Sequence, residues 1–383
     1  MSGLTTFINK GLNPFLKTVV LLLSILMLNM TFGAQSVAAT RSTNNSPVNV
    51  GLPWWVWPGS DTLTGGGNGG SEINPLLSGE FENKAGKRGY KLFLPKNIVA
   101  QKTPLIVILH GCFQSGDNMA NGTEIMPVAE KMGFAVLFPE QTYGDNVWKC
   151  WNWFKPENLQ RGTGEASIIA GMTLDVVKKN KLNAGKVFVS GLSAGGAMSA
   201  NLLACYSDVF KGAMVHSGLM YDAARTEDEA HEVTKNGSTR SPQEGAMNAY
   251  KCSPKRNSPV QLLVVHGTKD NFVNPLNVEQ IFQEFSILND LIDDGQINNS
   301  FESVKTETVV KAEYGNYGAH VATYANNGNN WAEVVWIDEM AHGWSGGQPV
   351  APYMESRGIK AINPMLNLFL GANLPLNDWP KKK

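Results

Sequence analysis

The chain has 383 residues, 43% of them hydrophobic, and a formal net charge of −1 from 32 basic and 33 acidic residues. This balance gives no electrostatic basis for binding nucleic acid or an anionic membrane, so neither is expected as a partner. The apolar fraction is sufficient for a sizeable core, and one large α/β domain can be as long as this chain.

The first forty residues have the pattern of a secretory signal peptide. Lys10 and Lys17 precede the apolar run 18–28, and small residues follow up to Ala38 and Ala39. The run is short for a membrane span, although an uncleaved anchor or a buried helix is the alternative. We expect residues 1–39 to be a cleaved signal peptide, and the mature protein to be secreted or periplasmic without stable membrane association.

Residues 40–80 are expected to form an N-terminal tail that contains a glycine-rich loop at 65–70. No strand pattern leads into these glycines and no helix pattern follows them, so they do not indicate a dinucleotide-binding loop. The remaining span, 81–375, is expected to be a single catalytic domain.

Strand and helix patterns alternate along this domain. Continuous apolar runs, typical of strands buried on both faces, are separated by stretches with helical spacing. The expected strands are 90–95, 104–109, 134–138, 186–190, 212–216, 261–265 and 332–337, and the expected helices are 121–132, 165–179 and 194–206. This order predicts an α/β fold with a mostly parallel sheet flanked by helices. Two irregular stretches, 223–259 and 277–303, are expected to be cap-like insertions.

The segment Gly191-Leu-Ser193-Ala-Gly195 contains the pattern G-x-S-x-G. An apolar strand leads into it and a helix pattern leads out, which is the context of a nucleophile elbow. Glycines permit the close backbone approach that such a sharp turn requires. An ordinary glycine-rich turn is the alternative, but the context favours Ser193 as a catalytic nucleophile.

A nucleophilic serine needs a histidine base and an acid that orients it. Asp270 follows the strand 261–265 and His342 follows the strand 332–337, so the chain order is Ser, Asp, His. Both lie at carboxyl ends of strands, where parallel sheets place their ligands. Asp338 and Glu339 are nearer to His342 in sequence, but proximity in sequence does not direct a carboxylate at the ring.

Acyl transfer also requires two backbone amides that stabilise the oxyanion. We expect one from Ala194, next to the nucleophile, and one from Cys112 in the loop after the strand 104–109. The His110-Gly111 pair could alternatively form only a tight turn. This chemistry needs no cofactor and no metal.

Tryptophans gather around Cys150, and another stands beside the candidate base. Trp151 and Trp153 could line an apolar cleft, or they could pack a loop, and Trp344 follows His342 by two residues. All three are candidate substrate contacts. The four cysteines include no C-x-x-C pair, so two disulfides are expected rather than zinc, with three pairings open.

Five motifs occur in order along the chain: His110-Gly-Cys112, Cys150-Trp-Asn-Trp-Phe154, Gly191-Leu-Ser-Ala-Gly-Gly196, His266-Gly-Thr-Lys-Asp270 and Met340-Ala-His-Gly-Trp-Ser-Gly-Gly347. Taken together, these motifs resemble the poly(3-hydroxybutyrate) depolymerase family of esterases, and the resemblance runs from about Gly89 to Leu370.

The resemblance implies an α/β-hydrolase fold, a Ser193–His342–Asp270 triad, and oxyanion donors at Cys112 and Ala194. It also implies that Cys112 pairs with Cys150 and Cys205 with Cys252.

The implied partner is a polyester or oligoester. We expect the protein that hydrolyses it to be monomeric. No separate polymer-binding domain is expected after Leu370, which puts action on crystalline polymer in doubt. A feruloyl or acetylxylan esterase acting on plant polysaccharide, and a non-catalytic binding protein, are the alternative functions.

Overall fold

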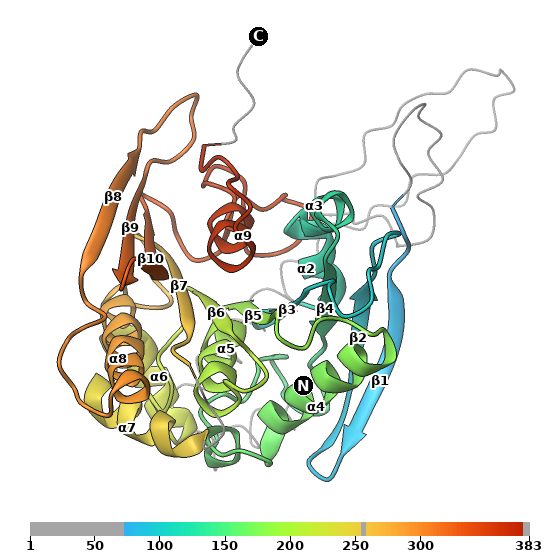
Figure 1. Cartoon of the computed structure of the whole chain (residues 1–383), viewed down its shortest axis with the longest axis horizontal. Helices are drawn as coiled ribbons and strands as arrows, with labels where there is room; N and C mark the ends of the chain where they lie inside the picture. The colour runs from blue at the N-terminus through green and yellow to red at the C-terminus, as the bar shows by residue number, and fades with distance from the viewer. Residues whose placement is uncertain (1–72, 254–257, 378–383) are drawn as a thin grey trace, which may run out of the picture. The chain divides into compact units, whose positions relative to one another are not determined.

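The computed structural model describes residues 73–253 and 258–377 (Figure 1). The predicted signal peptide, and the glycine-rich loop with most of the predicted tail, lie outside the described residues. Within the described ranges, no helix is both long and apolar enough to cross a bilayer.

A ten-stranded sheet forms the centre of the described domain, with the strand order β1-β2-β4-β3-β5-β6-β7-β10-β9-β8. The six strands from β4 to β10 in this order pair in parallel, and the two strands at each end pair antiparallel. The strands are β1 (Leu77–Asn83), β2 (Gly86–Phe93), β3 (Leu105–Leu109), β4 (Ala135–Pro139), β5 (Val187–Leu192), β6 (Gly212–His216), β7 (Gln261–Gly267), β8 (Val304–Val310), β9 (Ala319–Asn326) and β10 (Asn329–Ile337).

Helices cover both faces of the sheet (Figure 1). One face packs against α2 (Gly116–Gly122), α3 (Ile125–Met132) and α9 (Ile362–Leu370). The other packs against α4 (Gly164–Lys179), α5 (Ala194–Cys205), α6 (Glu227–Asn236), α7 (Pro242–Cys252) and α8 (Leu276–Asp293). The short 3-10 helix η1 (Pro156–Leu159) precedes α4, and β11 (Trp344–Ser345) pairs with β12 (Met354–Glu355) apart from the main sheet. This is the α/β-hydrolase architecture that the sequence predicts.

The central strand β3 shows why the sequence reads as a continuous apolar run. Leu105, Val107 and Leu109 pack on the side of α4 and α5. Ile106 and Ile108 pack on the side of α2 and α3. All five side chains are buried, because each face of the strand is covered by a helical layer.

One predicted helix, 121–132, is wrong: the structure has two helices, α2 and α3, with a break between them. The amide and hydroxyl of Thr123 both donate to the Met119 carbonyl and close α2. Glu124 then adopts a left-handed conformation with φ 56°, which cannot continue a helix.

The stretch 277–303 is also not a cap-like insertion over most of its length. Helix α8 occupies its first part and buries Val278, Ile281 and Phe285 against the sheet. The sheet, moreover, begins at Leu77, inside the predicted tail, because β1 pairs with β2 along its whole length.

Candidate active site

Ser193 occupies a tight turn between β5 and α5. Its backbone has φ 58° and ψ −120°, and its amide donates to the His216 carbonyl at 2.9 Å. A Cβ at Gly195 would lie 2.5 Å from the Leu109 carbonyl oxygen, and one at Gly191 would overlap the backbone of Gly195. The glycines are therefore required by close backbone approach, and the turn has the form of a nucleophile elbow.

Asp270 and His342, on the loops after β7 and β10, are directly hydrogen-bonded. The His342 Nδ1 and the Asp270 Oδ2 are 2.8 Å apart, and the Asp270 Oδ1 accepts from the amides of Phe272 and Val273. Burial opposes ionisation of Asp270, but the hydrogen bond with His342, with a smaller contribution from the Val273 amide, lowers the pKa of this carboxyl below its usual value. With Nδ1 held by the carboxylate, Nε2 is the ring nitrogen left to accept a proton.

His266 supports the Asp270 loop from the strand end of β7. Its Nε2 lies 3.0 Å from the Val273 carbonyl and 3.6 Å from the Asp270 Oδ2. Burial lowers the pKa of His266, so the ring is neutral and its Nε2–H donates to the carbonyl.

His216, at the end of β6, connects the serine turn to the His342 loop. Its carbonyl accepts from Ser193, and its Nε2 accepts from the Ser345 amide at 2.9 Å. Its ring stacks on Trp344 with centroids 5.4 Å apart. Burial lowers the pKa of His216 to about 3, so the ring is neutral. In the described part of the chain no direct hydrogen bond joins Ser193 to His342. Instead, His216 bonds to both segments and so brings the serine turn and the His342 loop together.

The loop of Cys112 lies beside the serine turn. A Cβ on Gly111 would be 3.5 Å from the Ser193 Cβ. Buried Gln114 fixes the loop, because its Oε1 accepts from the Gly111 amide and its Nε2 donates to the Pro352 carbonyl. Among the described residues, no atom accepts a hydrogen bond from the amide of Cys112 or from that of Ala194. Both amides are therefore free to donate to a ligand.

The three tryptophans predicted as substrate contacts are buried. Trp151 is inaccessible and its Nε1 donates to the His110 carbonyl, while Trp153 and Trp344 are 5% and 1% exposed. This corrects the prediction: Trp151 and Trp153 are core residues of the loop, and Trp344 packs under the His342 loop. Their rings are buried in the fold, and sequence position alone does not reveal this.

Two other aromatic side chains flank the candidate base at the surface. Phe272 is 59% exposed with its ring centroid 5.3 Å from that of His342, and Tyr353 is 38% exposed with its centroid 6.0 Å away. Neither residue was predicted from the sequence. The position of Phe272, two residues after Asp270, was the only sequence signal for either.

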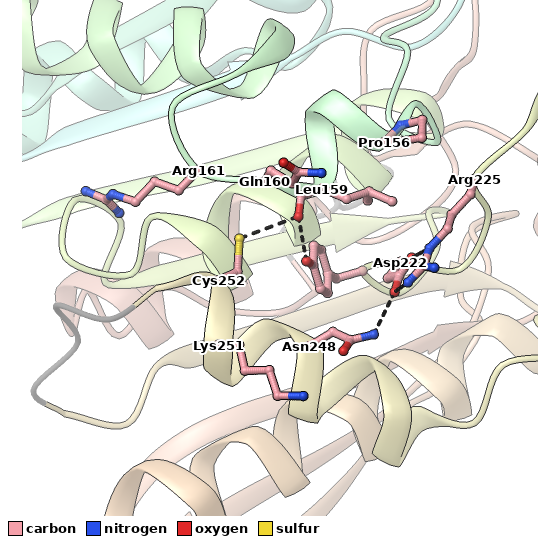
Figure 2. A pocket seen from close by; sticks show the side chains of 10 residues that line it. Pro156, Leu159, Gln160, Arg161, Asp222, Arg225, Asn248, Lys251 and Cys252 are labelled. Carbon is pink, nitrogen blue, oxygen red and sulfur yellow. Dashed lines mark hydrogen bonds and ion pairs between the residues drawn. The ribbon is translucent and has the colours of Figure 1, made fainter.

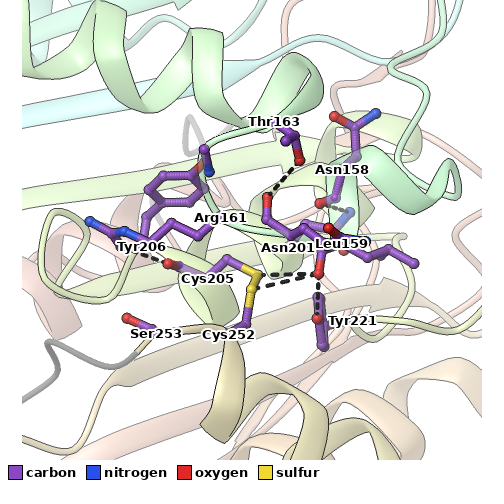
Figure 3. The surroundings of a disulfide bond; sticks show 12 residues. Asn158, Leu159, Arg161, Thr163, Asn201, Cys205, Tyr206, Tyr221, Cys252 and Ser253 are labelled. Atoms are coloured by element: carbon purple, nitrogen blue, oxygen red, sulfur yellow. Dashed lines mark hydrogen bonds between the residues drawn. A yellow bond between two sulfur atoms is a disulfide. The ribbon is translucent and has the colours of Figure 1, made fainter. Parts of the chain in front are cut away.

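Both disulfides have the pairing that the resemblance implies, Cys112 with Cys150 and Cys205 with Cys252. The second joins the ends of α5 and α7 against η1, where its two sulfur atoms and the Tyr221 hydroxyl all contact the Leu159 carbonyl (Figure 3). It is a structural cross-link that holds helices of one layer together.

A cavity of about 660 Å³ lies beside this cross-link (Figure 2). Its lining includes Arg161, Arg225 and Lys251, and the Asp222 carboxylate pairs with Arg225 at 2.7 Å. None of the predicted site residues lines this cavity. In residues 73–253 and 258–377, no group of three or more His, Cys, Asp or Glu side chains is arranged to hold a metal ion.

Comparison with known proteins gives a family match and several relatives. Residues 88–308 match the family model described as esterase PHB depolymerase. Poly(3-hydroxyalkanoate) depolymerase C of Paucimonas lemoignei is 29% identical over 247 residues, which are 63% of this chain and 55% of that protein. A probable acetylxylan esterase A of Aspergillus clavatus is 30% identical over 52% of this chain and 65% of its own length. A feruloyl esterase B of Thermothelomyces thermophilus is 29% identical over 48% and 64%.

The match therefore spans between 55% and 65% of the length of these relatives. Among solved structures, an acetyl xylan esterase from Aspergillus awamori superposes with a TM-score of 0.57 at 18% identity, and the match covers 74% of this chain and 93% of that one. This likeness supports the fold.

Proposed function

Because the chain belongs to the PHB depolymerase family of esterases, we propose that it is a serine esterase whose triad is Ser193, His342 and Asp270. The observation that carries the proposal is the hydrogen bond between His342 and buried Asp270, on a loop tied through His216 to the Ser193 turn.

In the proposed mechanism, the His342 Nε2 takes the proton of the Ser193 hydroxyl as its oxygen attacks the ester carbonyl. Asp270 holds the tautomer and stabilises the imidazolium. The amides of Cys112 and Ala194 donate to the oxyanion, and His342 then protonates the departing alcohol. Water, activated by the same histidine, releases the acid and regenerates the serine.

As substrate we propose poly- or oligo-(3-hydroxyalkanoate) esters, since a poly(3-hydroxyalkanoate) depolymerase is among the relatives. The exposed rings of Phe272 and Tyr353 beside His342 offer an apolar surface for an aliphatic chain. The second candidate is an acetyl or feruloyl ester of polysaccharide, favoured by the acetylxylan and feruloyl esterases among the relatives.

We also propose that the protein acts outside the cytoplasm. Two disulfides persist in oxidising compartments, and the sequence pattern of residues 1–39 is that of a signal peptide. Detection of a mature form in the medium or periplasm, shortened at its N-terminus, is the expected result.

The test of activity compares the wild-type protein with Ser193→Ala. Wild type is expected to hydrolyse amorphous polyhydroxybutyrate and a short p-nitrophenyl ester, and to react with a fluorophosphonate. Ser193→Ala is expected to lose all three reactions and to keep the melting temperature of the wild type. Full activity of the variant would refute the triad. Turnover of methyl ferulate or acetylated xylan alone would support the second candidate, and failure of the wild type to label would indicate a binding protein.

A further inference from the structure

The loop that carries the Cys112 amide is held by a second loop, residues 141–152. The Cys112–Cys150 disulfide joins them covalently. The Phe113 amide donates to the Trp148 carbonyl at 2.8 Å, and the Gln141 amide donates to the His110 Nε2 at 3.0 Å. The position of the Cys112 amide therefore depends on the position of the second loop.

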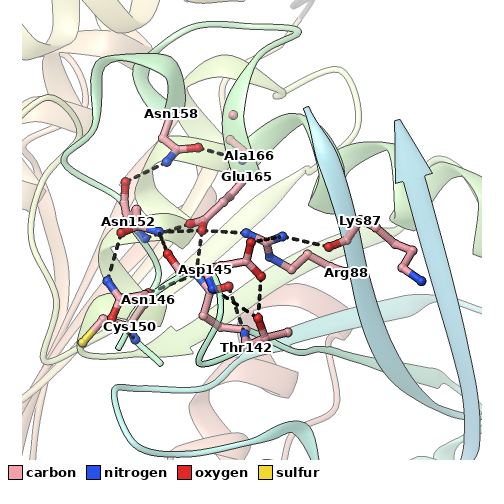
Figure 4. Close-up of polar contacts among 12 residues, drawn as sticks. Lys87, Arg88, Thr142, Asp145, Asn146, Cys150, Asn152, Asn158, Glu165 and Ala166 are labelled. Carbon is pink, nitrogen blue, oxygen red and sulfur yellow. Dashed lines mark hydrogen bonds and ion pairs between the residues drawn. The ribbon is translucent and has the colours of Figure 1, made fainter. Parts of the chain in front are cut away.

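That second loop converges on one buried carboxylate, Glu165, in the first turn of α4 (Figure 4). Its Oε1 accepts from the Gln141 Nε2 at 2.5 Å, the Asn152 Nδ2 at 2.7 Å and the Arg88 Nη2 at 3.0 Å. Its Oε2 accepts from the Asn152 amide at 2.8 Å. The Gln141 Nε2 also donates to the Cys150 carbonyl, so the carboxylate is two hydrogen bonds from the disulfide.

Charge holds the same carboxylate in place. Arg88, on β2, is buried and forms ion pairs with Glu165 and with Asp145, each at 3.0 Å. The N-terminal end of α4 adds the positive end of a helix dipole. Glu165 thus links β2, α4 and the 141–152 loop, although its hydrogen bonds reach no residue of the proposed triad.

We propose that Glu165 is a positioning residue that sets the Cys112 amide for oxyanion stabilisation, acting through the 141–152 loop and the Cys112–Cys150 disulfide. This inference rests on the proposed function. An amide that is needed most in the transition state affects turnover more than substrate binding, so its misplacement lowers kcat and leaves KM nearly unchanged.

Glu165→Gln tests the proposal because a glutamine cannot replace the carboxylate in either orientation. With its NH₂ at the Oε2 position it opposes the Asn152 amide, and with its NH₂ at the Oε1 position it opposes three donors. Loss of one oxyanion donor lowers kcat by about 10²–10³-fold, so partial displacement is expected to lower it by roughly 10–100-fold.

Asp290→Asn is the matched control. Asp290 is also a buried carboxylate that accepts four hydrogen bonds, from the amides of Asn298, Asn299 and Ser300 and from the Ser300 hydroxyl. Asp290 fixes a loop that contacts the start of β10, because the Phe301 carbonyl accepts a hydrogen bond from the Trp331 Nε1. His342 follows the other end of this strand. Asp290→Asn should therefore lower the melting temperature and leave kcat unchanged.

The measurements are kcat and KM on a p-nitrophenyl ester, Ki of a trifluoromethyl ketone whose serine adduct carries an oxyanion, and the melting temperature. We expect Glu165→Gln to lower kcat and raise Ki by similar factors, with KM within about twofold of wild type. Wild-type kcat in Glu165→Gln, an effect on KM alone, or equal losses of kcat in both variants would overturn the positioning role.

If Glu165→Gln does not fold, Gln141→Met takes its place, since it cuts the link to Cys150 and keeps the side-chain length. A several-fold loss of kcat supports the proposal and an unchanged kcat overturns it. An inactive wild type or an active Ser193→Ala would instead be a failure of the proposed function, so the two failures are distinguishable.

Discussion

Asp270 uses each carboxylate oxygen for a different purpose. Oδ1 accepts two backbone amides of its own loop, and Oδ2 faces the His342 Nδ1. In Asp270→Asn the Oδ1 bonds can be kept, but the amide NH₂ then faces Nδ1. The ring must take the tautomer that protonates Nε2, which prevents it from accepting the serine proton.

We therefore expect Asp270→Asn to lower kcat by about 10³–10⁴-fold with little change in melting temperature. Steady-state kinetics on a p-nitrophenyl ester and thermal unfolding by circular dichroism measure the two quantities. Lys269→Gln, at the neighbouring exposed position, is the control and should be unaffected. A loss below tenfold would mean that Asp270 does not orient the base.

Phe272 exposes most of its ring beside His342, so we expect it to contribute to substrate contact rather than to the core. Covering an aromatic face with an aliphatic chain stabilises a complex by about 1–2 kcal/mol. Phe272→Ala should raise KM for long-chain p-nitrophenyl esters by roughly 5–30-fold. The acetate ester, which is too short to reach the ring, serves as the matched substrate. An equal rise in KM for both esters would contradict a contact between Phe272 and the aliphatic chain.

At this scale the sequence predicts side chains that a chemical motif demands, but not those whose role comes from packing. Ser193, Asp270 and His342 were named because the chain order and the strand ends restrict the choice. Trp151 was misassigned because an aromatic ring near a site can face either the core or the solvent. His216 is the last residue of its strand, which puts it at the same edge of the sheet, but its link between two loops is visible only in three dimensions.

Among the elements, the β5–α5 turn depends most strictly on its sequence. The Cα of Gly195 faces the carbonyls of Leu109 and His110 at the end of β3, and an added Cβ would lie 2.5 and 2.6 Å from their oxygen atoms. Either β3 or α5 would have to move. Such overpacking costs typically 1–3 kcal/mol and more where only backbone can yield.

Gly195→Ala should therefore lose at least about 3 kcal/mol of unfolding free energy and most of the activity. Urea unfolding of the purified variant measures the loss. Gly144→Ala is the matched control, since an added Cβ there meets only the Thr142 hydroxyl at 3.6 Å, and it should unfold like wild type. A stable, active Gly195→Ala would show that the turn can relax.

The central strands could be predicted because burial on both faces leaves a continuous apolar run. Strand β6 has the predicted bounds, and β3 and β5 differ by one or two residues at their ends. Strand β8 was not predicted, because six of its seven residues are exposed and no apolar period results. The α2–α3 break depends on the backbone conformation of Glu124, which side-chain spacing does not encode.

For the whole molecule, the dependence of stability on pH can be derived from buried ionisable groups. Burial raises the pKa of Glu333, on β10, to about 7 from a usual value of 4.5. The unfolded chain therefore loses this proton at lower pH than the folded protein. As pH rises from 4.5 to about 7, the free energy of unfolding falls, because the folded protein must bury an ionised Glu333. This energetic penalty is fully present above pH 7.

Glu333→Gln removes this penalty. It should be about 1–3 kcal/mol more stable than wild type at pH 8 and equally stable at pH 4.5. The two proteins are compared at each pH because buried His110 and His216, with pKa values lowered to about 4 and 3, add the same acid dependence to both. A stability difference that does not change with pH would contradict this account of Glu333.

The Cys205–Cys252 bridge also determines what a protease can do to this protein. It encloses residues 206–251, including α6 with its exposed Lys235, in a covalent ring. A single peptide-bond cut anywhere in that ring creates two new chain ends but releases no fragment. Nicked protein should therefore run as one band on a non-reducing gel and as two bands once thiol is added, so limited digestion would be invisible without reductant.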